Sequence, residues 1–323
     1  MERELQRFEA RAPTTEDFRA IAELILACDL ADYGEPDYLE EELLADWKEI
    51  DLRTDAWVIV APDGGLAGYA AVENRGRTLL YAEGYVHPRY TGRGLGARLV
   101  RLTEARAREH VRLAIPETRV VLDNTINGRN EAARMLLERE GYRATRHFWR
   151  MTIELEDAPE QDSPGEVSIR PCVPGRDERA VFEALDEALR DHWGYLPTTF
   201  EDWERRKKRF GFDPGLWMLA VDGDEVAGAA VCQNRSGAGY VSELAVRRPW
   251  RRRGLGLALL RRAFAEFYSR GVREVALAVD SQNLTGATRL YERAGMWVER
   301  LYSLYRKELR PVHQPGGGSR MGS

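Results

Sequence analysis

The chain contains the same pattern twice, 160 residues apart. Aligning Trp57 with Trp217 gives 14 identities over 45 positions, where ordinary composition would give about three. The identities include one glycine-rich block in each copy: Arg93, Gly94, Leu95, Gly96 and Arg253, Gly254, Leu255, Gly256. A duplication of this length predicts two copies of one domain, each with its own glycine-rich loop.

The length agrees with two domains. A chain of 323 residues is longer than one ordinary core and divides into halves of about 150 residues. Residues 156–166 are polar and contain two prolines, which indicates a linker. We expect an N-terminal domain over 1–155, a C-terminal domain over 167–310, and a flexible tail rich in glycine and serine over 311–323.

The composition is that of a water-soluble globular protein. Hydrophobic residues make up 43% and charged residues 31% of the chain, and the net charge of −5 gives no general reason to bind nucleic acid. No apolar run is long enough to cross a membrane, and the first residues lack the apolar core of a signal peptide. We expect a cytoplasmic protein with neither nucleic acid nor membrane as a partner.

The cysteines and histidines argue against a metal site. The three cysteines form no Cys-x-x-Cys pair, and the five histidines show no spacing typical of metal ligands. Buried free thiols are the simpler interpretation of the cysteines. We therefore expect no metal cofactor.

Hydrophobic periodicity predicts the same order of elements in both halves. The elements expected in the first half are strands and helices at 57–60, 67–73, 80–86, 95–110, 119–122 and 131–140. Those expected in the second half lie at 167–170, 177–190, 199–210, 217–221, 226–233, 240–246, 255–269, 275–279, 285–294 and 297–305. Hairpins combined with crossover helices predict an α/β (α+β) fold of two tandem domains, each a mixed, largely antiparallel sheet flanked by helices.

The loop between the strand ending at Val246 and the helix beginning at Leu255 is suited to an anion. A helix N-terminus offers free backbone N–H groups and the positive end of the helix dipole. Gly254 and Gly256 let the backbone approach a ligand closely. The loop is not followed by the Lys-Ser/Thr of a Walker loop, and a structural turn remains the alternative. The same loop recurs in the first half, which favours a site for a diphosphate.

The loop resembles that of the GNAT superfamily of acyl-CoA-dependent N-acyltransferases. The family pattern is Arg or Gln, two residues, Gly, one residue, and Gly or Ala, which residues 251–256 match fully. Residues 91–96 match except that Thr91 replaces the leading Arg or Gln. The resemblance covers nearly the whole chain as two such domains, similar to mycothiol synthase and related tandem enzymes. It implies acetyl-CoA as the co-substrate.

A second family signature follows the loop, and here the two copies differ. Asn283, Ala287, Tyr291 and Gly295 resemble the family pattern in which the Asn lies near the pantetheine arm and the Tyr lies beside the thioester sulfur. In the first half, Leu137 stands where Tyr291 stands. The first domain is therefore expected to be degenerate, although its loop still predicts that it binds acetyl-CoA.

The resemblance also implies catalytic roles. Glu243, on a predicted strand, is the expected base, and Tyr291 is the expected acid that protonates the thiolate. The alternatives are that Glu243 is a structural carboxylate that holds the loop arginines, and that Tyr291 is a core aromatic residue. Glu83 occupies the position of Glu243 in the first half. Asn283 has the alternative of capping the helix that follows it.

The expected cofactor contacts come from both loops and the strands before them. They are Leu244, Ala245, Val246, Arg251, Arg252, Arg253, Gly254, Leu255, Gly256 and Asn283 in the second half, and Tyr85, Val86, Arg93, Gly94, Leu95 and Gly96 in the first. The family binds its acceptor beside the first two helices, which here implies His192, Trp193 and Tyr195.

These residues predict an acetyl-CoA-dependent N-acetyltransferase that modifies a primary amine of a small molecule in its C-terminal domain. One alternative is an acyl-CoA sensor or scaffold without catalysis. Others are an N-acetyltransferase that acts on proteins or peptides, and an enzyme with two working domains. We expect a monomer or a homodimer.

Overall fold

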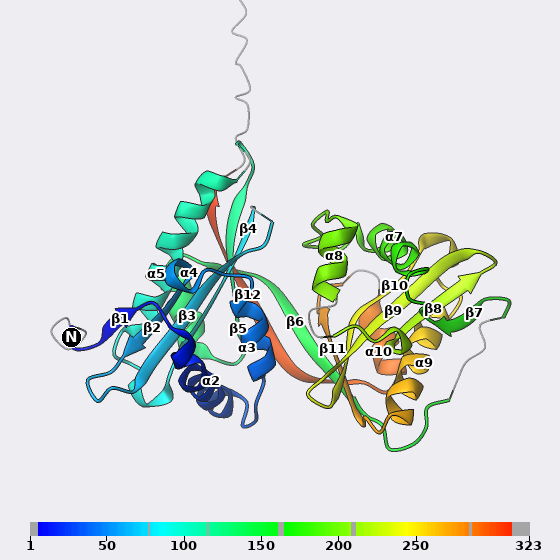
Figure 1. The fold of residues 1–323 in the computed structure, drawn as a ribbon, viewed down its shortest axis with the longest axis horizontal. Coiled ribbons are helices and arrows are strands. Elements are labelled where there is room, and N and C mark those ends of the chain that lie inside the picture. The colour runs from blue at the N-terminus through cyan, green and yellow to red at the C-terminus, as the bar shows by residue number, and fades with distance from the viewer. Residues whose placement is uncertain are drawn as a thin grey trace, which may run out of the picture. The chain divides into compact units, whose positions relative to one another are not determined.

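The computed structural model describes residues 6–76, 78–114, 116–160, 165–207, 211–283 and 286–311. The chain forms two compact units (Figure 1). Unit 1 comprises Met1–Thr145 together with Ser303–Ser323, and unit 2 comprises Arg146–Tyr302. Both units have the predicted α/β fold, with helices flanking a mixed, largely antiparallel sheet.

Unit 1 has the strand order β1-β2-β3-β4-β5-β12. Neighbouring strands from β1 to β4 are antiparallel, whereas β4 and β5 are parallel. The strands are β1 (Glu9–Arg11), β2 (Ala56–Val60), β3 (Leu66–Asn74), β4 (Leu79–Val86), β5 (Val120–Asn127) and β12 (Trp297–Arg310). The helices are α2 (Phe18–Asp32), α3 (Glu40–Trp47), α4 (Leu52–Asp55), α5 (Leu95–His110) and α6 (Glu131–Arg139).

Unit 2 repeats this plan with the strand order β6-β11-β10-β9-β8-β7. Its one parallel pair, β10 with β11, corresponds to β4 with β5. The strands are β6 (Arg143–Glu154), β7 (Ser168–Pro171), β8 (Trp217–Asp222), β9 (Glu225–Arg235), β10 (Ala238–Val246) and β11 (Glu274–Asp280). The helices are α7 (Glu178–Leu189), α8 (Phe200–Lys207), α9 (Leu255–Ser269) and α10 (Ala287–Arg293). Of the helices expected at 199–210 and 285–294, residues 208–210 and 285 lie outside the described residues.

The two units exchange their last strands. β6 follows the helices of unit 1 in the sequence, yet it pairs with β11 of unit 2 from Phe148 to Glu154. β12 follows the helices of unit 2, yet its part from Ser303 onward lies in unit 1 beside β5. Arg306 of β12 forms a two-pronged ion pair with buried Asp123 of β5, at 2.6 and 2.7 Å. The predicted domain boundaries at 155 and 167 therefore place β6 in the N-terminal half although it belongs to unit 2. They place the end of β12 in the C-terminal half although it belongs to unit 1.

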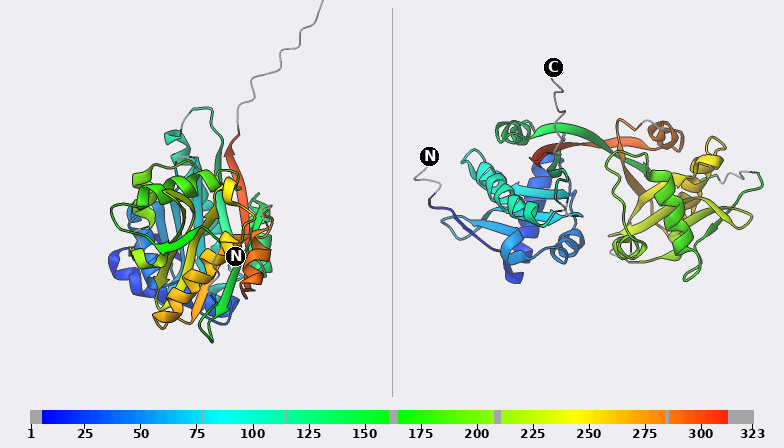
Figure 2. Two further views of the ribbon diagram at one scale, coloured as in Figure 1. Left: turned by 90° about the vertical axis from the view of Figure 1, so that its right-hand side faces the viewer. Right: turned by 90° about the horizontal axis from the view of Figure 1, so that it is seen from above.

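Helices cover both faces of the central strands in each unit. Along β8, Trp217 and Leu219 pack against α7 and α8, whereas Met218 and Ala220 pack against α9. Figure 1 shows α7 and α8 on one side of these strands and α9 on the other. Because both faces are covered, β8 is a continuous apolar run instead of an alternating pattern. In unit 1, α5 and the pair α2 and α3 cover opposite faces in the same way (Figure 2).

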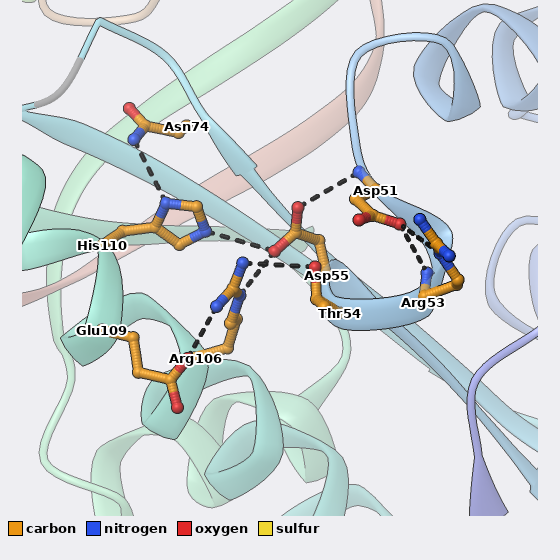
Figure 3. Close-up of polar contacts among 8 residues, drawn as sticks. All are labelled: Asp51, Arg53, Thr54, Asp55, Asn74, Arg106, Glu109 and His110. Atoms are coloured by element: carbon orange, nitrogen blue, oxygen red, sulfur yellow. Dashed lines mark hydrogen bonds and ion pairs between the residues drawn. The ribbon is translucent and has the colours of Figure 1, made fainter.

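A buried polar network holds the end of α5 to α4 in unit 1. The carboxylate of Asp55 accepts hydrogen bonds from Arg106 Nε at 2.6 Å and from the backbone N–H of Asp51 at 3.1 Å, and it contacts His110 Nε2 at 3.2 Å (Figure 3). The other ring nitrogen of His110 faces the Asn74 amide at 3.4 Å. Burial acts to raise the pKa of Asp55, but these partners outweigh it and hold the pKa below its usual value. The network is structural, because it ties helix ends together.

Candidate active site

The glycine loop of each unit begins its long helix with a left-handed residue. Gly254 precedes α9 with φ of 79°, and Gly94 precedes α5 with φ of 81°. L-residues with side chains rarely adopt this conformation, so glycine is required there. Buried Leu255 and Leu95 anchor the first turns in the cores. The first N–H groups of both helices therefore point out of the loop without intrahelical partners, as an anion site requires.

The second glycine of each loop makes room for the helix that follows the parallel pair of strands. A Cβ on Gly256 would lie 2.8 Å from Leu290 Cδ1 of α10, and one on Gly96 would lie 2.9 Å from Leu136 Cδ2 of α6. The glycines therefore allow close packing of α9 on α10 and of α5 on α6. This places the two signature segments of each unit side by side.

Four of the five loop arginines divide into two pairs. Arg247 donates to Glu187 at 2.7 Å, and Arg248 pairs with Asp191, so both are engaged by carboxylates. Arg252 and Arg253 are exposed, and Arg252 has a left-handed φ of 63° where the first unit has Gly92 at 74°. Strain of this kind is concentrated at functional sites.

Arg251, the fifth arginine, fastens the loop to the protein. Its guanidinium donates to the carbonyls of Val246 at the end of β10 and of Ala188 at the end of α7, both at 3.0 Å. Unit 1 has Thr91 at this position and makes the connection in another way. Cys28, which corresponds to Ala188, donates its thiol to the carbonyl of Val86 at 3.3 Å. Both units thus tie the end of the central strand to the first long helix.

Glu243 lies directly after a bulge in β10. The register with β9 shifts between Val241 and Glu243, and the intervening Ser242 donates its hydroxyl to the Val231 carbonyl at 2.9 Å. After the bulge, the expected cofactor contacts Leu244 and Ala245 resume pairing with β9. A bulge redirects the side chain that follows it and is common beside active sites.

Two residues of α8 hold the Glu243 carboxylate. Trp203 Nε1 donates to one oxygen at 3.2 Å, and Lys207 Nζ lies 2.8 Å from the other. The structural alternative for this glutamate assigns it to the loop arginines, whereas the carboxylate contacts two residues of α8. No motif in the sequence pointed to Lys207. The only signal was that Trp203 and Lys207 are four residues apart and therefore share one face of a helix.

Tyr291 lies on α10 in the core of unit 2 and is 8% exposed. Burial raises the pKa of its phenol to about 12, so the group is protonated at neutral pH. Its counterpart Leu137 is buried in the core of unit 1.

Gly286 occupies the N-cap position of α10, so the alternative that Asn283 caps this helix is wrong. In unit 1, by contrast, Asn130 does cap α6, because its side chain accepts from the Ala133 N–H at 2.9 Å.

The three predicted acceptor residues follow α7. Trp193 packs 6.3 Å from the ring of Phe148 and carries the Arg146 guanidinium 5.0 Å from its own ring centre. Tyr195 donates its hydroxyl to Asp186 at 2.5 Å. Burial, and next the nearby charge of Arg251, lower the pKa of His192. His192 is therefore neutral at physiological pH and adjoins the fastened loop.

Comparison with known proteins identifies the family. The profile of the acetyltransferase (GNAT) family matches residues 18–142 and again residues 180–296. The chain belongs to this family. It is an acetyltransferase that uses acetyl-CoA as its co-substrate, with two GNAT domains in tandem.

Several relatives share both domains. The chain is 33% identical over 250 residues to mycothiol acetyltransferase of Thermobispora bispora, which covers 75% of this chain and 80% of that protein. It is 30% identical over 305 residues to mycothiol acetyltransferase of Paenarthrobacter aurescens, covering 88% and 91%. The crystal structure of a GCN5-related N-acetyltransferase from Sphaerobacter thermophilus is similar at 45% identity and a TM-score of 0.87, over 95% of this chain and 97% of that one.

The described residues offer neither a membrane-spanning helix nor a metal site. They contain no helix long and apolar enough to cross a membrane. They also contain no group of three or more His, Cys, Asp or Glu side chains arranged to hold a metal ion.

Proposed function

We propose that unit 2 transfers the acetyl group of acetyl-CoA directly to a primary amine of a small molecule. The observation that carries this proposal is the difference between two nearly duplicate sites. Unit 2 has a buried phenol, Tyr291, where unit 1 has Leu137. The duplicates retain the loop and the strand glutamate, but only one of them retains a proton donor for a leaving thiolate.

The proposed reaction uses two proton transfers. The amine nitrogen attacks the thioester carbonyl carbon while its proton passes to the Glu243 carboxylate, directly or through water. The carbon–sulfur bond then breaks, and the thiolate takes a proton from the Tyr291 hydroxyl, which solvent later restores. Trp203 holds the carboxylate in place through its indole N–H. The backbone N–H groups of Leu244 and Ala245 are the proposed donors to the developing oxyanion.

The loop before α9 is the proposed site of the CoA diphosphate. The amides of Gly254, Leu255 and Gly256 supply donors. The exposed Arg252 and Arg253 are the proposed source of positive charge. Arg251 is not assigned to the diphosphate, because its guanidinium already donates to two backbone carbonyls. We propose that Asn283 contacts the pantetheine arm.

Unit 1 is proposed to bind acetyl-CoA without turning it over. Its loop has the same left-handed glycine before the helix, so the amides of Gly94, Leu95 and Gly96 are available. Tyr85 and Val86, at the end of β4, are the proposed contacts beside the loop. However, the Asn130 side chain is occupied, because it caps α6 and donates to Asp32 at 2.9 Å.

The proposed acceptor site lies beside His192, Trp193 and Tyr195. The relatives are named for mycothiol, which supports a small-molecule acceptor for this chain too. A decisive assay follows free thiol release from acetyl-CoA with small amines and with peptide N-termini. Turnover with a small amine supports the proposal, whereas turnover with peptides alone would make the protein a peptide N-acetyltransferase.

A further inference from the structure

Lysine is rare in this chain. Four of its 48 basic residues are lysines, at positions 48, 207, 208 and 307, and the rest are arginines. The two residue types differ in their chemistry. An arginine guanidinium stays protonated in proteins, whereas a lysine can lose a proton and act as a nucleophile. One of the four lysines, Lys207, lies against the proposed base of unit 2.

Lys207 is the last residue of α8, and its ammonium contacts Glu243. Lys207 Nζ lies 2.8 Å from Oε1 of the carboxylate, and the two side chains are only 14% and 21% exposed. The other basic residues of α8, Arg205 and Arg206, are exposed. The helix therefore directs its arginines outward and its one lysine toward the strand glutamate.

Two contacts on the last turn of α8 fix the position of this amine. Trp203 is buried against the ring of Trp217 and donates to the other oxygen of Glu243. At the other end of the turn, the backbone carbonyl of Lys207 accepts a hydrogen bond at 2.9 Å from the buried side chain of Gln233 on β9. Both ends of the turn are fastened to the sheet, so the fold itself holds the Lys207 ammonium at the carboxylate.

Lys207 Nζ has the position that the proposed reaction requires of an acceptor nitrogen. That nitrogen must lie within hydrogen-bonding reach of the base. The proposed oxyanion donors, Leu244 and Ala245, follow Glu243 on the same strand, so the thioester carbonyl would lie beside the same carboxylate. A reacting group that the fold holds at this place has a high effective concentration.

The structural alternative is that Lys207 only balances the charge of Glu243. An arginine would serve that purpose, and this chain uses arginine in comparable places: Arg106 pairs with Asp55, and Arg306 pairs with Asp123. At Glu243 the partner is instead a primary amine, which can lose its proton.

We propose that unit 2 acetylates its own Lys207 when acetyl-CoA is bound and no external amine is present. This inference rests on the function proposed for unit 2 and adds a modification site to it. The Lys207 ammonium passes one proton to Glu243 and on to solvent, and the free Nζ attacks the thioester carbonyl carbon. The nitrogen–carbon bond forms and the carbon–sulfur bond breaks, the second amine proton passes to Glu243, and Tyr291 protonates the thiolate. The products are acetyl-lysine, the CoA thiol and one proton.

The test is mass spectrometry of peptides from the full-length chain, before and after incubation with acetyl-CoA alone. We expect Lys207 to approach one acetyl group per chain, counting any already present after purification. The rate should not depend on protein concentration, because donor and acceptor are held in one chain. Lys207→Arg keeps the positive charge and should remove the modification, whereas Lys208→Arg, the matched change at the neighbouring residue, should keep it. Lys48 and Lys307 should stay unmodified over the same time.

Two further variants separate catalysed from spontaneous transfer. Glu243→Gln and Tyr291→Phe should each slow the acetylation of Lys207 at least tenfold, and circular dichroism and thermal melting check that each variant is folded. An unchanged rate in both variants, or equal acetylation of Lys48 and Lys207, would overturn the proposal.

Thiol release with small amines separates this proposal from the function proposed for unit 2. An unmodified Lys207 in a preparation that releases thiol with a small amine would overturn self-acetylation and leave that function intact. Absence of both Lys207 acetylation and thiol release would overturn the two together.

Discussion

Replacing Tyr291 with phenylalanine removes one oxygen atom and leaves the ring that fills the core. The Tyr291 hydroxyl makes no hydrogen bond within the described residues, so its loss strands no partner. The free energy of unfolding should therefore change by less than about 0.5 kcal/mol. General acid catalysis contributes about 10²- to 10⁴-fold to a rate, or about 3 to 5 kcal/mol of activation free energy. We expect kcat to fall by that factor while thermal stability stays constant.

The assay is the initial rate of thiol release at saturating acetyl-CoA and amine, measured from pH 6 to pH 10. With the pKa of Tyr291 raised to about 12, about one molecule in 10⁴ has an ionised Tyr291 at pH 8. The wild type should therefore show no loss of rate from this group across the range. Leu137→Met is the control, because it conserves volume at the matching position of unit 1. If Tyr291→Phe keeps a third or more of the wild-type kcat, or if both variants lose activity equally, the assignment of Tyr291 as the acid is refuted.

Two further predictions concern the loop and the stability in acid. Gly254→Val forces a β-branched residue to φ of 79° and should raise the KM for acetyl-CoA at least tenfold. The matched change in unit 1, Gly94→Val, should leave turnover within about threefold of the wild type. Equal effects of the two variants would contradict the assignment of turnover to unit 2. A hydrogen bond from Arg11 lowers the pKa of Asp17 to about 2. Because the pKa of Asp17 is lower in the folded than in the unfolded state, ionised Asp17 stabilises the fold above about pH 4. This stabilisation is lost as the pH falls from about 4 to about 2. Asp17→Asn should therefore cost about 1 to 2 kcal/mol in urea unfolding at pH 6, with the difference from wild type shrinking toward pH 2; a constant difference would refute this origin.

Much of the fold follows from local sequence pattern. The strands β8, β9 and β10 and the helix α9 were predicted to within a few residues, because apolar runs and the Asp-Gly-Asp turn determine them locally. The loop was predicted from Gly254 and its duplicate Gly94. Both adopt the left-handed conformation that only glycine adopts easily.

The strand exchange was not predictable from these patterns. The sequence pattern predicted a strand at 297–305, within β12, and predicted none at β6, and a strand pattern does not say which sheet edge receives the strand. The partners of β6 and β12 depend on long-range contacts such as Arg306 with Asp123, which are 183 residues apart. The same limit applies to Glu243. Its strand was predictable, but its pairing with Lys207 depends on how α8 packs.

The most direct test of the account is a crystal structure of the protein with CoA and the amine that gives turnover. The account predicts CoA in unit 2, with its diphosphate on the amides of Gly254 and Gly256 and its sulfur within hydrogen-bonding distance of the Tyr291 hydroxyl. The amine nitrogen should lie within reach of Glu243, directly or through one water. A sulfur far from Tyr291, or an amine seated beside a CoA thiol in unit 1 alone, would contradict it.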